Sequence, residues 1–166
     1  MARPPAVIDT NVVVGGLLAD EAEAATCRSL HAMLAGRFFY LLSEAPLAEY
    51  RRVLLRPRIH ALHGLSGDEV DTILLEIAAN GGVRIPSSTP ECSPDPGDQH
   101  LWDLAAAEPG VVLVTGEGKL LERPPAFARL AAFAQPWGPA WGARSPLVQE
   151  QGLVPGRGGQ PPGHPP

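Results

Sequence analysis

The sequence predicts an α/β protein with a central parallel sheet of four to five strands flanked by helices. Short apolar runs alternate along the chain with segments of helical periodicity, and this alternation is typical of strands joined by crossover helices. The runs are continuous in apolar residues, as expected for parallel strands that are covered on both faces. Gly, Pro, Ser and Asp separate them, which marks the connections.

The expected elements of the first half can be placed in chain order. They are a strand at 6–9, a helix near 20–35, a strand at 37–42, a helix at about 44–55, a connector at 58–65, a helix that starts at 66 or 67, and a short strand at 83–85. Ser43 is a good helix N-cap and Pro46 fits the first turn of the following helix, which must stop before Pro57.

The second half is marked by a long loop and by a clear fourth strand. The expected elements are a loop at 86–100, a helix at 100–108, a strand at 111–115, a helical turn that begins at 119, and either a helix or an edge strand at 128–134. We expect one domain at residues 1–135 and a disordered Pro/Gly-rich tail at 136–166.

The composition excludes several classes of protein. The chain has 166 residues, of which 45% are apolar, enough for one domain with its own core. No apolar run approaches the roughly 18 residues that a membrane span needs, so we expect a cytoplasmic protein without membrane contact. Cys27 and Cys92 form no CxxC or Cys/His pattern, which argues against a zinc site and a disulfide framework.

The chain is acidic overall, but several of its basic residues are clustered. Thirteen Lys and Arg against 18 Asp and Glu give a net charge of −5, which argues against a protein that coats nucleic acid nonspecifically. Four arginines nevertheless follow closely after Glu49: Arg51, Arg52, Arg56 and Arg58. Their guanidinium groups could hold RNA phosphates, and the alternative is a solvated helix face.

Four carboxylates stand where elements begin or end: Asp9, Glu49, Asp98 and Glu117. Such positions can converge in the crevice at the carboxyl ends of parallel strands, where open sheets usually bind ligands. A cluster of this kind repels itself unless a cation fills it. Oxygen ligands without nearby Cys or His suit Mg²⁺ or Mn²⁺, and those ions serve phosphodiester hydrolysis. The pattern therefore favours a divalent-metal nuclease.

Two of these carboxylates have simpler interpretations that must be weighed. Asp9 could cap the turn that follows it, but a charge at the end of an apolar strand is costly unless a partner or a metal compensates. Asn11 could orient a ligand carboxylate from the second shell. Glu49 borders the apolar side of its helix and can point into the crevice, whereas the helix dipole alone explains Glu44.

The other two carboxylates also have structural alternatives. Asp95 and Asp98 form an acceptable capping arrangement, although Asp98 lies on the same face as apolar residues of its helix. Asp103 faces another way, so we regard it as peripheral. Glu117 follows a Thr-Gly turn at the end of the fourth strand, and its simpler interpretation is a turn glutamate paired with Lys119.

Three segments in this order resemble the PIN (PilT N-terminus) domain family, particularly its VapC-like ribonucleases of toxin–antitoxin pairs. They are VIDTNVVVGGLL, LLSEAPLAEYRRVLLRPRI and DPGDQHLWDLAAAEPGVVLVTGEGKLL, and the resemblance covers roughly residues 6–122. It implies a three-layer PIN-like fold. It places Asp9, Glu49, Asp98 and Glu117 on the family's catalytic, metal-binding positions, with Asn11, Thr115 and Asp95 in support.

The same resemblance implies an activity and partners. The activity is Mg²⁺- or Mn²⁺-dependent hydrolysis of RNA by an endoribonuclease that is the toxin of a toxin–antitoxin pair. The partners are the RNA substrate, a cognate antitoxin protein and a second copy in a homodimer.

The chain departs from the family pattern at two places. The fourth motif usually reads Thr-Gly-Asp, and here Glu117 stands in place of the Asp. The family's final strand is hard to find after residue 122. The main rival interpretation is therefore a degenerate PIN domain that acts as an RNA- or protein-binding scaffold. A haloacid dehalogenase-type phosphatase and a response-regulator-like domain are weaker rivals; the former needs a second Asp where Asn11 stands, and the latter lacks its acidic pair.

Overall fold

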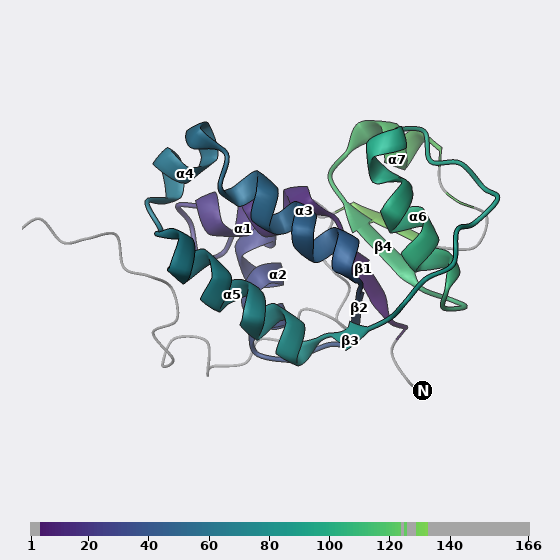
Figure 1. The fold of residues 1–166 in the computed structure, drawn as a ribbon, viewed down its shortest axis with the longest axis horizontal. Coiled ribbons are helices and arrows are strands. Elements are labelled where there is room, and N and C mark those ends of the chain that lie inside the picture. The colour runs from purple at the N-terminus through teal and green to yellow at the C-terminus, as the bar shows by residue number, and fades with distance from the viewer. Residues whose placement is uncertain (1–3, 124, 126–128, 133–166) are drawn as a thin grey trace, which may run out of the picture.

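The structure is a computed structural model that describes residues 4–123, 125 and 129–132. Within these residues the chain forms one five-stranded parallel sheet in the order β3-β2-β1-β4-β5 (Figure 1). The strands are β1 (Ala6–Ile8), β2 (Tyr40–Leu42), β3 (Gly82–Val83), β4 (Val112–Thr115) and β5 (Arg129–Ala132). The predicted fold class is confirmed.

Seven α-helices and one 3₁₀ turn connect the strands in the described part of the chain. They are α1 (Thr10–Leu18), α2 (Ala25–Leu34), α3 (Glu44–Leu54), α4 (Pro57–His63), α5 (Gly67–Asn80), η1 (Pro96–Asp98), α6 (Gln99–Ala106) and α7 (Gly118–Glu122). None of these helices has the length and apolar character that crossing a membrane requires.

Two apolar clusters lie on opposite faces of the sheet and make the fold three-layered. Ile8 of β1 belongs to the larger cluster, which contains the buried side chains of α1, α2, α3 and α5. Its neighbour Val7 points to the other face, where it joins Leu101 and Trp102 of α6. Figure 1 shows these two groups of helices on either side of the strands.

The order in which the chain adds strands to the parallel sheet reverses between β1 and β4. From β1 the chain adds β2 and then β3 on one side, and it later returns to add β4 and β5 on the other. The register pairs Ile8 with Val114, so β1 and β4 end at the same level. Such a switch point opens a crevice at the carboxyl ends of the strands, because the connecting helices leave to opposite faces.

The structure corrects several predicted boundaries. A helix near 20–35 was expected, but α1 begins at Thr10 directly after β1 and a second helix begins at Ala25. The expected connector at 58–65 is mostly the helix α4, because Pro57 at its start favours a new helix as well as ending the previous one. Residues 129–132 form a strand, so the final strand that seemed absent is present.

Two of the helices begin with different capping interactions. Ser43 occupies the N-cap position of α3, yet its side chain makes no capping hydrogen bond. Ser66 and Glu69 form a complete capping box at the start of α5. The predicted domain boundary at 135/136 and the tail at 136–166 lie outside the described residues.

Candidate acidic metal centre

Asp9 and Thr115 meet across the switch point between β1 and β4. The Thr115 hydroxyl Oγ1 donates a hydrogen bond to Asp9 Oδ2 at 2.6 Å, and the Asp9 backbone N–H donates to the Val114 carbonyl at 2.9 Å. Asp9 is 3% exposed and Thr115 is fully buried. The carboxylate is therefore held at the carboxyl end of β1 by the strand that runs beside its own.

Burial leaves the Asp9 charge only partly compensated. Burial is the largest cause that raises the pKa of Asp9, and repulsion from Glu49 adds to it. The hydrogen bond from Thr115 and the backbone N–H groups of Asn11 and Thr10 act in the opposite direction. Asp9 makes no capping hydrogen bond to α1, and Asn11 is exposed. The support for this carboxylate thus comes mainly from Thr115.

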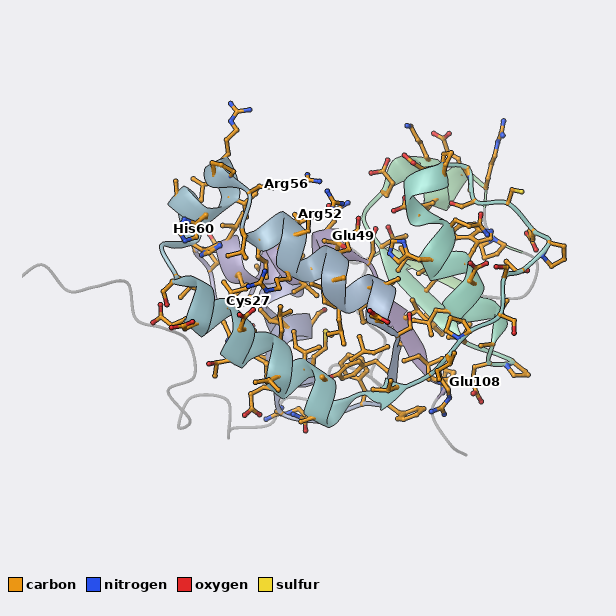
Figure 2. The ribbon with its side chains drawn as sticks, viewed as in Figure 1. Cys27, Glu49, Arg52, Arg56, His60 and Glu108 are labelled. Carbon is orange, nitrogen blue, oxygen red and sulfur yellow. The ribbon has the colours of Figure 1, made fainter. Side chains whose placement is uncertain are left out.

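Glu49 lies on α3 and has three polar neighbours. Thr10 Oγ1 donates to Glu49 Oε2 at 2.9 Å, and Arg52 Nη2 donates to Oε1 at 3.1 Å. His100 Nε2 of α6 lies 3.0 Å from Glu49 Oε2, but without the geometry of a hydrogen bond, so it contributes charge when the imidazole is protonated. In Figure 2, Glu49 lies on the edge of α3 nearest to α6 and α7.

Asp98 has the largest pKa shift among the acidic residues of the site. Its pKa is raised to about 7, first by burial and then by repulsion from Asp9, Asp95, Glu49 and Glu117. Asp98 stands at the N-cap position of α6 without a capping hydrogen bond. The capping interpretation therefore does not explain Asp98, and the four other carboxylates are close enough to oppose its ionisation.

Asp95 and Glu117 occupy the outer part of the cluster. Asp95 accepts a hydrogen bond from Gly97 N at 2.9 Å, and Lys119 Nζ lies 3.7 Å from its other oxygen, so Asp95 acts as a turn cap with an ion pair. Glu117 is half-buried, and its backbone N–H donates to Thr115 Oγ1 at 2.9 Å. Thr115 therefore links the backbone of Glu117 to the carboxylate of Asp9.

The donor set fits a hard divalent cation. Among the described residues, no three His, Cys, Asp or Glu side chains are already arranged to hold a metal ion. Coordination would therefore require carboxylates to turn toward one another. The chemistry of the set fits nevertheless, because carboxylate oxygens suit Mg²⁺ and Mn²⁺ and a cation would relieve the repulsion at Asp98.

The predicted RNA-binding arginines divide into two groups. Arg51 makes a two-point contact with Asp71 of α5, at 2.7 and 3.2 Å, and this contact ties α3 to α5. Arg52 reaches Glu49, while Arg56 and Arg58 are exposed. Figure 2 shows Glu49, Arg52 and Arg56 in sequence along one side of the molecule, leading away from the acidic cluster.

Several residues near the site were not identified from the sequence. Thr10 and His100 contact Glu49, yet each lies next to a more conspicuous acidic motif and forms no motif of its own. Asp103, regarded as peripheral, accepts hydrogen bonds from Thr89 N at 2.8 Å and Gln99 Nε2 at 3.1 Å. It anchors the loop that leads toward Asp95, along the α6 side of the molecule (Figure 1).

Comparison with known proteins gives one match. The family model described as PIN domain matches residues 5–119, more than half of the chain. Neither a curated protein nor a solved structure matches it. The matched range includes Asp9, Glu49, Asp98 and Glu117.

Proposed function

This chain belongs to the PIN domain family, whose members are generally nucleases that use divalent metals, and from that premise we propose that it is a metal-dependent endoribonuclease. The observation that carries the proposal is geometric: the fold brings Asp9, Glu49 and Glu117, which come from separate segments, into electrostatic range of Asp98. Burial and four neighbouring carboxylates disfavour its charge, and a divalent cation in the crevice is the partner that would offset this repulsion.

Each residue of the centre has a proposed role. Asp9, Glu49, Asp98 and Glu117 would hold Mg²⁺ or Mn²⁺, and Thr115 orients Asp9. When bound, the cation lowers the pKa of water and offsets the charge that develops at the phosphate. Water adds in line to phosphorus, the bond to the 3′-oxygen breaks, and the products carry a 5′-phosphate and a 3′-hydroxyl.

The phosphate backbone of the RNA would follow the exposed guanidinium groups. Arg52 and Arg56 lie on the side of the molecule that leads away from Glu49, so they can bind successive phosphates. Arg58 is an exposed further contact on α4. Arg51 is the least suited of the four, because Asp71 already engages its guanidinium group at two points.

The biological role is a separate proposal. We infer a toxin of a toxin–antitoxin pair, since the three segments around the acidic residues are similar to those of VapC-like ribonucleases. A cognate antitoxin would then block the crevice, and a homodimer is the expected assembly. Growth arrest on induction of the wild-type chain, relieved by Asp9→Asn, supports this role; unimpaired growth at high expression contradicts it.

Cleavage of a mixed set of single-stranded and structured RNAs tests the nuclease proposal. We expect cutting with Mg²⁺ or Mn²⁺, none with EDTA, and loss of cutting in Asp9→Asn. Asp71→Asn is the matched control, because Asp71 is a surface residue that pairs with Arg51. Cutting that survives in Asp9→Asn, or that persists in EDTA, contradicts the proposal.

Two observations favour a second candidate function. Among the described residues no ready-made metal group is present, and Glu117 replaces the family's usual Asp. A scaffold that binds RNA without cutting it would have these features. RNA binding by the folded protein without cleavage at saturating Mg²⁺ and Mn²⁺ would select this alternative.

A further inference from the structure

Tyr50 joins the two elements that carry Asp9 and Glu49. It follows Glu49 directly on α3, and its hydroxyl donates a hydrogen bond to the backbone carbonyl of Ile8, the residue just before Asp9. The two residues are 42 positions apart in the sequence. A single buried contact therefore connects the neighbours of two carboxylates that come from different parts of the chain.

The surroundings of this hydrogen bond suit it to fix the distance between α3 and the end of β1. Tyr50 is fully buried, and a buried carbonyl such as that of Ile8 needs a hydrogen-bond partner. An ordinary tyrosine hydroxyl is neutral near pH 7, so Tyr50 can serve as the donor to this carbonyl. Its ring packs in the apolar cluster on the α3 side of the sheet, which fixes the direction of the hydroxyl.

We propose that Tyr50 is a positioning residue, whose hydrogen bond to Ile8 sets the separation between Glu49 on α3 and Asp9 at the end of β1. The inference rests on the proposed function, in which these two carboxylates share a cation. Tyr50→Phe would keep the ring and its packing but leave the Ile8 carbonyl without this donor. The hydrogen bond from Thr10 to Glu49 would remain, but the separation of Glu49 and Asp9 would be less closely fixed.

Tyr40 provides a matched control within the same core. It is also fully buried, and its hydroxyl donates to the backbone carbonyl of Ile77 at 2.7 Å. It has a second carbonyl contact, to Met33 at 3.3 Å. Neither carbonyl belongs to a residue next to the acidic cluster. Tyr40→Phe therefore removes the same kind of hydrogen bond from the same apolar layer, but away from the site.

The test compares Mn²⁺ binding and amide hydrogen exchange in wild type, Tyr50→Phe and Tyr40→Phe. We expect Tyr50→Phe to raise the Mn²⁺ dissociation constant about tenfold, the scale of losing a residue that orients a metal ligand. Tyr40→Phe should stay within about twofold of wild type. In the metal-free protein, Tyr50→Phe should speed exchange at residues 8–12, and Tyr40→Phe should leave that segment unchanged.

The outcomes separate this inference from the proposed function. Unchanged Mn²⁺ affinity in Tyr50→Phe, or equal weakening in both variants, overturns the positioning role. If wild type binds no Mn²⁺, the proposed function fails and the exchange measurement decides alone. Faster exchange at residues 8–12 only in Tyr50→Phe then supports the positioning role of Tyr50, and unchanged exchange there overturns it.

Discussion

The two sides of the acidic crevice differ in how their charges are compensated. On the α3 side, Glu49 has a hydroxyl donor, the guanidinium group of Arg52 and the imidazole of His100 as close neighbours. On the α6 side, Asp98 has no capping hydrogen bond, and repulsion from other carboxylates adds to its burial. Lys119, the nearby cation, lies against Asp95.

This difference indicates which carboxylate a bound cation would stabilise most. Glu49 is already stabilised within the protein, so binding a metal there must compete with Arg52 and His100. Asp98 gains a favourable partner, which it lacks among the residues that the structure describes. The negative charge of the carboxylates is therefore less well compensated on the α6 side than on the α3 side.

The largest effects are expected for the two carboxylates themselves. Asp98→Asn and Glu49→Gln should each reduce RNA cleavage about 100-fold or more, because each removes a proposed metal ligand. Their effects on the metal-free fold should be opposite. Asp98→Asn removes a repelled carboxylate and should stabilise the protein. Glu49→Gln also relieves repulsion on Asp9 and Asp98, but it removes the carboxylate that Thr10 and Arg52 contact, and we expect it to destabilise the protein. Urea unfolding in EDTA measures both changes in the free energy of unfolding. Changes of the same sign in the two variants would contradict the proposed difference between Asp98 and Glu49.

Stability of the metal-free protein should fall as the pH rises from about 4 to about 7. The folded pKa of Asp98 is about 7, above its unfolded value of roughly 3.9, so folding favours the protonated form. The penalty is absent below pH 4 and complete above pH 7. Because Asp98 is half-exposed, we expect about 1 to 2 kcal/mol.

Urea unfolding of the metal-free protein at pH 5 and pH 8 measures this loss. Asp98→Asn should flatten the decline, while Asp71→Asn should keep it. A wild-type protein that is more stable at pH 8 than at pH 5 would argue against an uncompensated Asp98.

Arg51 and Arg52 are neighbours on α3, but we expect their substitutions to have different effects. Arg52→Gln should raise KM for RNA about tenfold, the loss of one charged contact of roughly 1.4 kcal/mol. Arg51→Gln should leave KM near the wild-type value and change stability little, because Arg51 serves a solvent-exposed pair with Asp71. Steady-state kinetics over a range of salt concentrations measures both. Equal KM changes would remove the distinction between these neighbours.

The smallest effect is expected at Glu117. Glu117→Asp restores the family's usual residue and should tighten Mg²⁺ binding by about threefold, since Mg²⁺ demands near-ideal octahedral geometry. Glu117→Gln should weaken binding, and calorimetric titration with Mg²⁺ compares the three proteins. If Glu117→Asp binds Mg²⁺ more weakly than wild type, the longer side chain is an adaptation of this site.

Local patterns in the sequence predicted most of the sheet and its acidic ends. The apolar runs that end in Asp9 and Thr115 predicted β1 and β4, because strand composition is a local property. The helix α1 was missed because its valines and glycines have poor helix propensity, and packing against α2 outweighs that preference.

The contacts within the site could be predicted only in part. The sequence placed Asp9, Glu49 and Asp98 at element ends, and the fold brings them within electrostatic range. It could not show that Asp71 would engage Arg51, or that His100 would approach Glu49, because these partners come from separate helices. Such pairings depend on tertiary packing, and a single sequence carries no local pattern for them.

The most direct test of a metal-binding role for Asp98 is a thermal shift with Mg²⁺ at pH 7.5, made on wild type, Asp98→Asn and Asp71→Asn. We predict that saturating Mg²⁺ raises the Tm of wild type and Asp71→Asn relative to EDTA, and raises that of Asp98→Asn much less. An Asp98→Asn protein that gains as much from Mg²⁺ as wild type, or a wild type that gains nothing, would contradict a metal-binding role for the uncompensated side of the crevice.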